Sequence, residues 1–422
     1  MKIAIIGSGG REHAICQKIY ESKKKKKIFC IPGNGGTSKI AKNINLNLKN
    51  FNSIKEFLIS EKIDLTIVGP EEPLVNGIVD YLNKDGIKVF GPDKFCSKLE
   101  GSKIFTKKIC KSENIPTADF QIMKDKFSSL EYLKKKIYPL VVKADGLAAG
   151  KGVYICENFE DAKNAVEEIF NGKFGKADEI LIENFLEGEE MSFFILYDNN
   201  SFKVFNTAQD HKRIFEGDKG KNTGGMGAYS PSRLNNKELE EKILNKIILP
   251  TLKYLKEKGG VYKGFLYAGL MIKDEEPFLI EYNVRMGDPE CQTILPLLNN
   301  DLIDLFDYCV NGNLKDIDLS WRKKKSICIV ISSKGYPDEF EKNIFIKNLG
   351  MFENSELEYV FHAGTKLIDD KFYSSGGRVL NFVSIDDSYK LARQKALSLI
   401  KKLNWENGYY RRDIAYKVID NQ

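Results

Sequence analysis

Near the middle of the chain stands the sequence Lys143-Ala144-Asp145-Gly146-Leu147-Ala148-Ala149-Gly150-Lys151-Gly152-Val153. It lies between two expected strands, 139–143 and 153–156, so its glycines form a loop able to wrap a triphosphate, with Lys151 as a point charge. It is not a Walker A loop, because Gly146 and Gly150 are one residue too close and Gly152 replaces the Ser or Thr that would bind magnesium. The stretch predicts a glycine-rich lid over phosphates.

Two neighbouring segments extend this prediction to a nucleotide. Lys143 is a lone lysine after the apolar run 140–142. A buried lysine needs an anionic partner, and a phosphate contact is favoured over a purely structural one. The segment Glu183-Asn184-Phe185-Leu186, with Glu189, links two expected strands. A short acidic and apolar linker suits an adenine, with a carboxylate for the ribose hydroxyls.

The strand expected over 278–285 carries three polar side chains on one face. Glu281, Asn283 and Arg285 stand at alternate positions, and alternate side chains of a strand point the same way. Oxygen ligands of this kind suit a Mg²⁺ ion that bridges nucleotide phosphates, and Arg285 could grip a carboxylate or an acyl phosphate. The triad therefore predicts a metal and substrate site.

The first residues predict a strand, a glycine turn and a helix. Gly7-x-Gly9-x-x-Glu12 resembles a dinucleotide fingerprint, but Glu12 stands where the third glycine belongs, so a dehydrogenase is disfavoured. The turn could hold an anion beside Arg11 or be a plain tight turn. Apolar runs at 28–31, 63–68 and 87–90 alternate with helical patterns, as at 73–84, which predicts a parallel sheet with covering helices.

Composition narrows the class of protein. The 422 residues suggest about three domains, and 42% hydrophobic and 29% charged residues are typical of a globular chain. Net charge is +6 and the one dense basic run is Lys23 to Lys27, so no nucleic-acid partner is expected. No apolar run approaches the ~20 residues of a membrane span. Eight scattered cysteines indicate reduced, buried thiols, and a cytoplasmic location is expected.

Several segments together resemble the phosphoribosylamine–glycine ligase family, also called glycinamide ribonucleotide synthetase, of the ATP-grasp superfamily. The resemblance runs from end to end of the chain and rests on 7–14, 32–37, 68–71, 143–153, 209–213, 222–231, 285–290, 361–365 and 376–380.

This resemblance implies an α/β fold with a Rossmann-like N-terminal domain, a central ATP-grasp domain and a small C-terminal α/β domain. We expect these domains at 1–102, 103–325 and 326–422, with a lid subdomain at about 116–190. The implied reaction joins glycine to 5-phosphoribosylamine with ATP and Mg²⁺ or Mn²⁺, through glycyl phosphate, in purine biosynthesis. A monomer is expected.

The resemblance also implies roles for individual residues. For ATP it suggests Lys103, Lys143, Gly150, Lys151, Gly152, Glu183, Phe185, Leu186 and Glu189, and for the metal Glu281 and Asn283. For the other substrates it suggests Gly9, Gly10, Arg11, Asp210, Thr223, Arg285, Asp288 and Pro289. Arg285, Asp210 and Lys151 are the candidate catalytic residues.

Two rival functions stay open at this point. The first is an ATP-grasp enzyme that acts on another carboxylate, such as a carboxylase, and the second is a nucleotide-binding protein without catalysis. The strand 267–271 offers no further metal carboxylate, so the number of metal ions is open.

Overall fold

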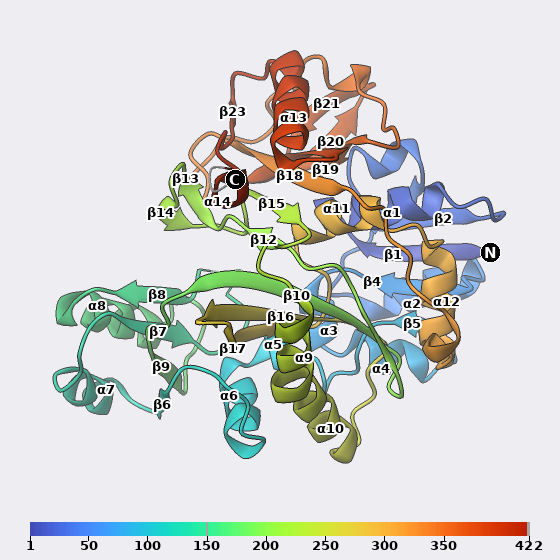
Figure 1. Ribbon diagram of the computed structural model, residues 1–422. Helices are drawn as coiled ribbons and strands as arrows, with labels where there is room; N and C mark the ends of the chain where they lie inside the picture. The colour runs from blue at the N-terminus through green and yellow to red at the C-terminus, as the bar shows by residue number, and fades with distance from the viewer. Residues whose placement is uncertain (149–150, 420–422) are drawn as a thin grey trace.

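The computed structural model describes residues 1–148 and 151–419. Its N-terminal part is a sheet of order β3-β2-β1-β4-β5 whose neighbouring strands are all parallel, as the sequence predicts (Figure 1). The strands are β1 (Lys2–Gly7), β2 (Lys27–Pro32), β3 (Lys42–Asn43), β4 (Leu65–Val68) and β5 (Val89–Phe90). The helices are α1 (Gly10–Tyr20), α2 (Phe51–Ser60), α3 (Glu71–Val75) and α4 (Ile78–Asn83). The single helix expected over 73–84 is interrupted, because Gly77 adopts φ +89°, a left-handed conformation that glycine allows.

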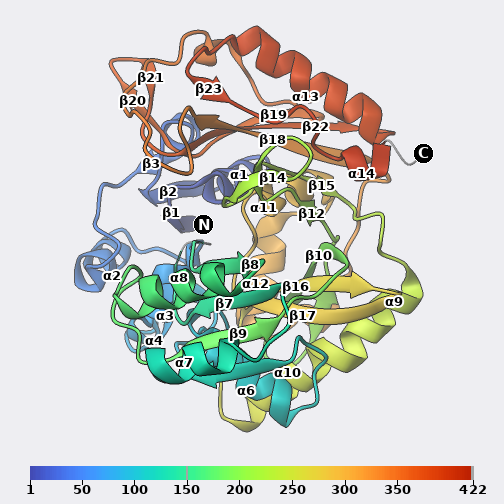
Figure 2. The ribbon, with the colours of Figure 1, turned by 90° about the vertical axis from the view of Figure 1, so that its left-hand side faces the viewer.

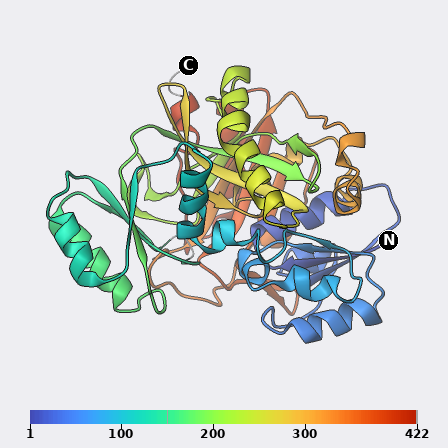
Figure 3. The ribbon, with the colours of Figure 1, turned by 90° about the horizontal axis from the view of Figure 1, so that it is seen from below.

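The glycine-rich stretch belongs to a separate lid subdomain. It is an antiparallel sheet of order β6-β9-β7-β8, with β6 (Phe120–Met123), β7 (Leu140–Ala144), β8 (Val153–Cys156) and β9 (Ile180–Asn184). Helices α7 (Lys126–Leu133) and α8 (Phe159–Phe170) cover it, as Figure 2 shows. The hydrophobic cluster of this subdomain draws its buried members from residues 123–182 alone. The subdomain therefore has its own core, and it projects away from the N-terminal sheet (Figure 3).

The central sheet has the order β11-β10-β16-β17 and is antiparallel. Its strands are β10 (Glu189–Tyr197), β11 (Phe202–Val204), β16 (Gly264–Lys273) and β17 (Glu276–Asn283). Helices α5 (Lys98–Gly101) and α6 (Lys103–Ser112) link it to the N-terminal part. The helix expected over 236–258 forms as α9 (Lys237–Ile243) and α10 (Leu249–Glu257), joined by a π-helical segment, Leu244–Ile248.

The last part of the chain builds a third sheet. Its own strands are β18 (Lys325–Ser333), β19 (Glu358–His362), β22 (Arg378–Asp386) and β23 (Gly408–Tyr409), with the hairpin of β20 (Thr365–Ile368) and β21 (Lys371–Ser374) beside it. Helix α13 (Tyr389–Leu403) packs on this sheet and α14 (Tyr416–Ile419) follows.

Two strands from the middle of the chain extend this C-terminal sheet, which has the order β12-β15-β18-β22-β19. They are β12 (Gln209–Asp210) and β15 (Gly227–Ser230), and between them lies the hairpin of β13 (Arg213–Phe215) and β14 (Lys219–Asn222). The polar and glycine-rich segments 210–213 and 222–227 suggest loops in the sequence, and 211–212 and 223–226 do lie outside the strands, but the ends of both segments belong to strands. These strands are short, and β15 pairs with β18, a strand far away in the sequence, so no local pattern reports them.

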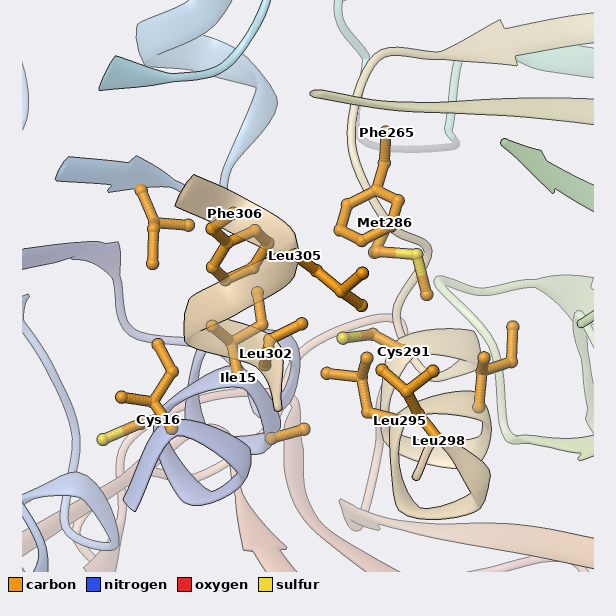
Figure 4. Close-up of a cluster of buried hydrophobic side chains, with 14 of the residues drawn as sticks. Ile15, Cys16, Phe265, Met286, Cys291, Leu295, Leu298, Leu302, Leu305 and Phe306 are labelled. Carbon is orange, nitrogen blue, oxygen red and sulfur yellow. The ribbon is translucent and has the colours of Figure 1, made fainter. Parts of the chain in front are cut away.

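One hydrophobic cluster joins the N-terminal, central and C-terminal parts. Figure 4 shows Ile15 and Cys16 of α1 near Leu302 and Phe306 of α12 (Leu302–Asn311), with Cys291 of α11 (Glu290–Ile294) alongside. Phe361 of β19 and Val383 of β22 belong to the same cluster. A continuous core of this kind fixes the three parts relative to one another. All eight cysteines are buried free thiols, and in the described residues no helix is long and apolar enough to cross a membrane.

Candidate functional site

The base of the lid subdomain holds a buried carboxylate between two buried lysines. Glu183, at the end of β9, lies 2.8 Å from Lys143 Nζ through Oε2 and 3.3 Å from Lys107 Nζ through Oε1. All three side chains are at most 5% exposed. Lys107 also donates to Thr117 Oγ1 at 2.5 Å. Lys143 was expected to need an anionic partner, and in this structure Glu183 is that partner.

Hydrogen bonds hold the first residues of the glycine-rich lid in place. The carboxylate of Asp145 accepts from Ser102 Oγ at 2.9 Å and from the Ile104 backbone at 3.1 Å. Ser102 also caps α6 by accepting from the Phe105 backbone. Lys103 Nζ reaches the carbonyl of Gly146 at 3.1 Å. The first residues of the lid are thus tied to the start of α6.

The tip of the lid touches the C-terminal part. Lys151 is exposed, and its Nζ donates to the Pro337 carbonyl at 3.4 Å. Gly152 is buried, and a Cβ there would lie 2.7 Å from the Ala148 Cβ, so a larger residue would not fit. Gly150, also predicted for the lid, lies outside the described residues.

Glu281 is the carboxylate toward which the positive groups converge. Burial favours its neutral form, but Lys212, Lys103 and Lys143 outweigh this and hold the pKa of Glu281 below its ordinary value. Burial also lowers the pKa of Lys103, an effect that Glu281 opposes. Lysines of this kind can bind a charged phosphate chain, and an ionised carboxylate among them can hold a cation that the phosphates share.

Glu281 and Asn283 fit a hard divalent cation. Both lie on β17, at alternate positions as the sequence predicts, and they offer carboxylate and amide oxygens. Within residues 1–148 and 151–419 no group of three or more His, Cys, Asp or Glu residues is placed to hold a metal. A cation here would complete its coordination with phosphate oxygens and water, as Mg²⁺ commonly does.

The linker between β9 and β10 presents the residues predicted for adenine and ribose. Phe185 is 37% exposed and Leu186 is partly buried. Glu189, at the start of β10, pairs with Arg233 through Oε1, while its buried Oε2 has no hydrogen-bond partner in the described part of the chain. One carboxylate oxygen is therefore left available.

Asp210 lies beside the loop that follows β14. Its Oδ1 is buried without a hydrogen-bond partner among the described residues. Burial, and then the nearby Glu290, raise the pKa of Asp210 well above its ordinary value. A Cβ on Gly225 would lie 2.8 Å from this Oδ1 and 2.6 Å from Pro289 Cδ. Thr223 Oγ1 accepts from the Gly225 backbone at 3.0 Å. The structure thus brings Asp210, Thr223 and Pro289 together, as predicted.

The two arginines predicted to bind substrate have partners within the protein. Arg285 Nη2 lies 2.7 Å from Glu100 Oε1, and its Nε lies 3.4 Å from Glu71. Arg11 Nη2 lies 3.8 Å from the same Glu71, and both arginines donate to the Met286 carbonyl. Burial raises the pKa of Glu100 to about 7 in spite of Arg285, whereas Arg285 and Arg11 overcome burial and hold the pKa of Glu71 at about 2.

Carboxylates of the chain itself occupy the glycine turn after β1. Glu12 Oε2 accepts from the Gly9 backbone at 2.6 Å, and Asp288 Oδ2 accepts from the Arg11 backbone at 3.3 Å. A Cβ on Gly10 would lie 2.5 Å from the side-chain amides of Gln292 and Asn381. The backbone N–H groups at the start of α1 are therefore bound by carboxylates of the protein itself.

Several residues of the site were not among those predicted for it: Lys107, Lys212, Glu290 and Arg378. Lys107 is one helical turn after Lys103 on α6, which is a signal that could have found it. Arg378 lies within one of the segments that carry the family resemblance, but only the fold shows that it donates to the Asp288 carbonyl at 2.6 Å.

The comparisons with known proteins cover almost the whole chain. Models of phosphoribosylglycinamide synthetase match as the N domain (residues 1–100), the ATP-grasp (A) domain (101–291) and the C domain (326–417). The chain is 44% identical to a phosphoribosylamine–glycine ligase of Caldanaerobacter subterraneus over 98% of this chain and 99% of that one.

Solved structures agree with this likeness. A phosphoribosylamine–glycine ligase of Thermotoga maritima has a TM-score of 0.85 at 32% identity and covers 98% of this chain and 100% of that one. The biotin carboxylase domain of Hydrogenobacter thermophilus 2-oxoglutarate carboxylase has a TM-score of 0.72 at 18% identity, with coverage of 97% and 91%. The second likeness concerns the fold alone.

Proposed function

The chain belongs to the phosphoribosylglycinamide synthetase family, and we propose how its residues share the work of that family's reaction. The protein is an ATP-dependent ligase that joins glycine to 5-phosphoribosylamine, giving glycinamide ribonucleotide, ADP and phosphate in purine biosynthesis. The observation that supports these roles most directly is geometric: Lys143 and Glu183 lie 2.8 Å apart at the base of the lid, and Lys103 donates to the lid carbonyl of Gly146.

The nucleotide lies between the lid and the central sheet in this proposal. Its phosphates contact Lys103 and Lys143, and its adenosine part contacts Glu183, Phe185, Leu186 and Glu189. The unpartnered Oε2 of Glu189 supports a contact with the ribose hydroxyls. The loop from Gly146 to Gly152, with Gly150 and Lys151, closes over the phosphates and excludes water.

Glu281 and Asn283 hold the divalent cation in this proposal, and the cation is Mg²⁺ or Mn²⁺, because both ions take hard oxygen ligands. When bound, such an ion offsets the negative charge of the phosphates. The ionised state of Glu281 supports this role.

Asp210, Thr223, Asp288 and Pro289 position glycine and phosphoribosylamine, and Gly9, Gly10 and Arg11 border this region through Asp288. The carboxylate of glycine attacks the γ-phosphate of ATP, giving glycyl phosphate and ADP. The amine of phosphoribosylamine then attacks the acyl carbon, and phosphate leaves. Holding the reactants together can lower the barrier by roughly 7–11 kcal/mol.

Arg285 offsets negative charge during the transfer. It lies two residues after Asn283, and its guanidinium is held in place by Glu100. The proposal also divides the chain into domains at 1–102, 103–325 and 326–422, with the lid at about 116–190. It further includes a monomeric state and a cytoplasmic location. The separate core of the lid supports its division from the rest.

The test is ADP release by the purified protein with Mg²⁺-ATP and glycine, with and without phosphoribosylamine formed in situ from ribose 5-phosphate and ammonia. A parallel reaction contains bicarbonate in place of glycine. We expect turnover only with glycine and phosphoribosylamine together. Release that depends on bicarbonate would instead support a carboxylase, and nucleotide binding without turnover would support a protein that lacks catalysis.

A further inference from the structure

A loop of the C-terminal part, residues 333–340, contacts the lid and the loop beside Asp210. We name it the β18 loop because it follows β18. Its Pro337 carbonyl accepts from Lys151 of the lid at 3.4 Å, and its Asp338 lies 2.8 Å from Lys221 Nζ on β14. The hydroxyl of Tyr336 accepts from the backbone N–H of Gly224 at 3.1 Å.

A second side chain of the C-terminal part, that of Arg378, binds the other polar group of the Gly224 backbone, its carbonyl. Arg378 Nη1 donates to the Gly224 carbonyl at 2.5 Å. A Cβ on Gly224 would lie 3.0 Å from Arg378 Cζ, so the backbone approaches the guanidinium closely. Both hydrogen-bonding groups of the Gly224 backbone are therefore bound by side chains that follow residue 326 in the sequence.

The position of Gly224 determines the space beside Asp210. Gly225, the next residue, has φ +111° and faces the unpartnered Asp210 Oδ1 and Pro289. A shift of Gly224 would carry Gly225 with it, toward or away from this carboxylate. A buried carboxylate oxygen without a partner is costly, so the space beside it is suited to a ligand that donates a hydrogen bond.

The β18 loop is built to hold Tyr336 firmly. The Tyr336 ring packs directly against Gly377, because a Cβ on Gly377 would lie only 2.3 Å from Tyr336 Cδ2. It also meets the Phe340 ring at 6.3 Å between centroids. Gly335 has φ +94°, and a Cβ there would lie 2.1 Å from the Glu339 carbonyl oxygen. Removal of the hydroxyl alone would thus leave the ring in place.

We propose that Tyr336 is a positioning residue for the amino-acid subsite beside Asp210, acting through Gly224. This inference rests on the proposed function, in which Asp210 is one of the residues that position the substrates, and it assigns the space beside Asp210 to glycine. The C-terminal part thereby contributes to recognition of the small amino acid without touching it.

The test compares Tyr336→Phe with the wild-type protein and with Tyr373→Phe. Tyr373 lies on β21 in the same part of the chain, and its hydroxyl makes no hydrogen bond within the described residues. The KM for glycine, ATP and phosphoribosylamine and the thermal unfolding midpoint are measured for all three proteins. Loss of one hydrogen bond predicts a KM for glycine roughly three- to tenfold higher in Tyr336→Phe.

The expected pattern also includes unchanged KM values for ATP and phosphoribosylamine and an unfolding midpoint equal to that of Tyr373→Phe. An unchanged KM for glycine would overturn the inference, as would an equal rise in all three KM values. If Tyr336→Phe lowers both the activity and the thermal unfolding midpoint, the hydroxyl has a structural role and the inference is wrong. Wild-type protein without glycine-dependent turnover would reject the proposed function itself, whatever the variant does.

Discussion

Glu183 and Lys143 form an ion pair of 2.8 Å in which both side chains are buried, at the base of the glycine-rich lid. Since Lys107 lies on the other oxygen of Glu183, the pair also fixes the lid subdomain to α6. A carboxylate between two buried lysines is stable only while its partners stay in place.

Lys107→Met removes one of these partners. We expect the free energy of unfolding to fall by about 2–4 kcal/mol, because Glu183 then keeps a buried charge with a single counter-ion. The KM for ATP should also rise, since Lys143 and Glu183 lose their fixed position. Urea unfolding and initial rates measure the two effects.

Lys126→Met is the matched control. Lys126 also pairs with a glutamate, Glu167 at 2.9 Å, but its side chain is 45% exposed. Its loss should cost no more than about 1 kcal/mol. Equal losses in the two variants would show that burial of the Lys107 pair has no special effect.

Lys151→Ala should lower turnover much more than stability. Within the described residues the Lys151 side chain makes one weak hydrogen bond, to the Pro337 carbonyl, so the unfolding midpoint should stay unchanged. The kcat should fall roughly 10- to 100-fold if Lys151 offsets phosphate charge. Lys176→Ala is the control, because Lys176 is an exposed lysine of the same subdomain. Wild-type turnover in Lys151→Ala would refute the role of the lid lysine.

Glu281→Gln should weaken the dependence on the divalent cation. We expect the Mg²⁺ concentration for half-maximal ADP formation to rise at least about tenfold, because an amide is a poorer ligand than a carboxylate. Glu276→Gln changes the other end of the same strand, where Glu276 pairs with Lys242 and Lys246, and should leave the titration unchanged. Identical Mg²⁺ titrations of the wild-type protein and Glu281→Gln would show that Glu281 is not a ligand of the divalent cation.

His13 should make the protein less stable in mild acid. Its Nδ1 accepts from the His362 backbone at 2.8 Å, and burial lowers the pKa of His13 from 6.5 to about 3. Above pH 6.5 neither state is protonated. Below it the unfolded state binds a proton that the folded state does not, so stability falls by about 1.4 kcal/mol per pH unit.

His13→Asn keeps an acceptor near the position of Nδ1 and removes the titration. Between about pH 6.5 and pH 5 the wild-type protein should lose about 2 kcal/mol more of its free energy of unfolding than the variant does. Glu100, with its pKa raised to about 7, acts in the opposite direction, but it is present in both proteins and cancels. Parallel pH profiles of urea unfolding in the two proteins would show that His13 does not titrate on unfolding.

The elements that the sequence predicts correctly are those with strong local patterns. The apolar runs that became β1, β2 and β4 contain enough information within a few residues. By contrast, β12 and β15 are short, with two and four residues, and β15 is paired with β18 from far along the chain. The register of such a strand depends on a partner that no local window contains.

The residues of the site likewise divide into those that the sequence predicts and those that only the fold shows. Lys143, Glu183 and Glu281 stand out in sequence because each is a charged residue in an apolar strand. Arg11 pairs with its neighbour Glu12. The other partners of Arg11 and Arg285 could not be predicted, since Glu71 lies on α3 and Glu100 on α5, and only the fold brings them to Arg285. Arg378 and Tyr336 lie more than a hundred residues from Gly224, and only the folded chain brings them together.

The pairing of β15 with β18 has a consequence for hydrogen exchange. Because β15 begins two residues after Gly225 and is bonded into the C-terminal sheet, its amide protons can exchange only when that sheet opens. The segment beside Asp210 therefore shares its opening events with α13 and β22, whereas the lid, with a core of its own, exchanges independently. The lid and the segment beside Asp210, which lie on two sides of the proposed site, thus belong to different cooperative units of the same chain.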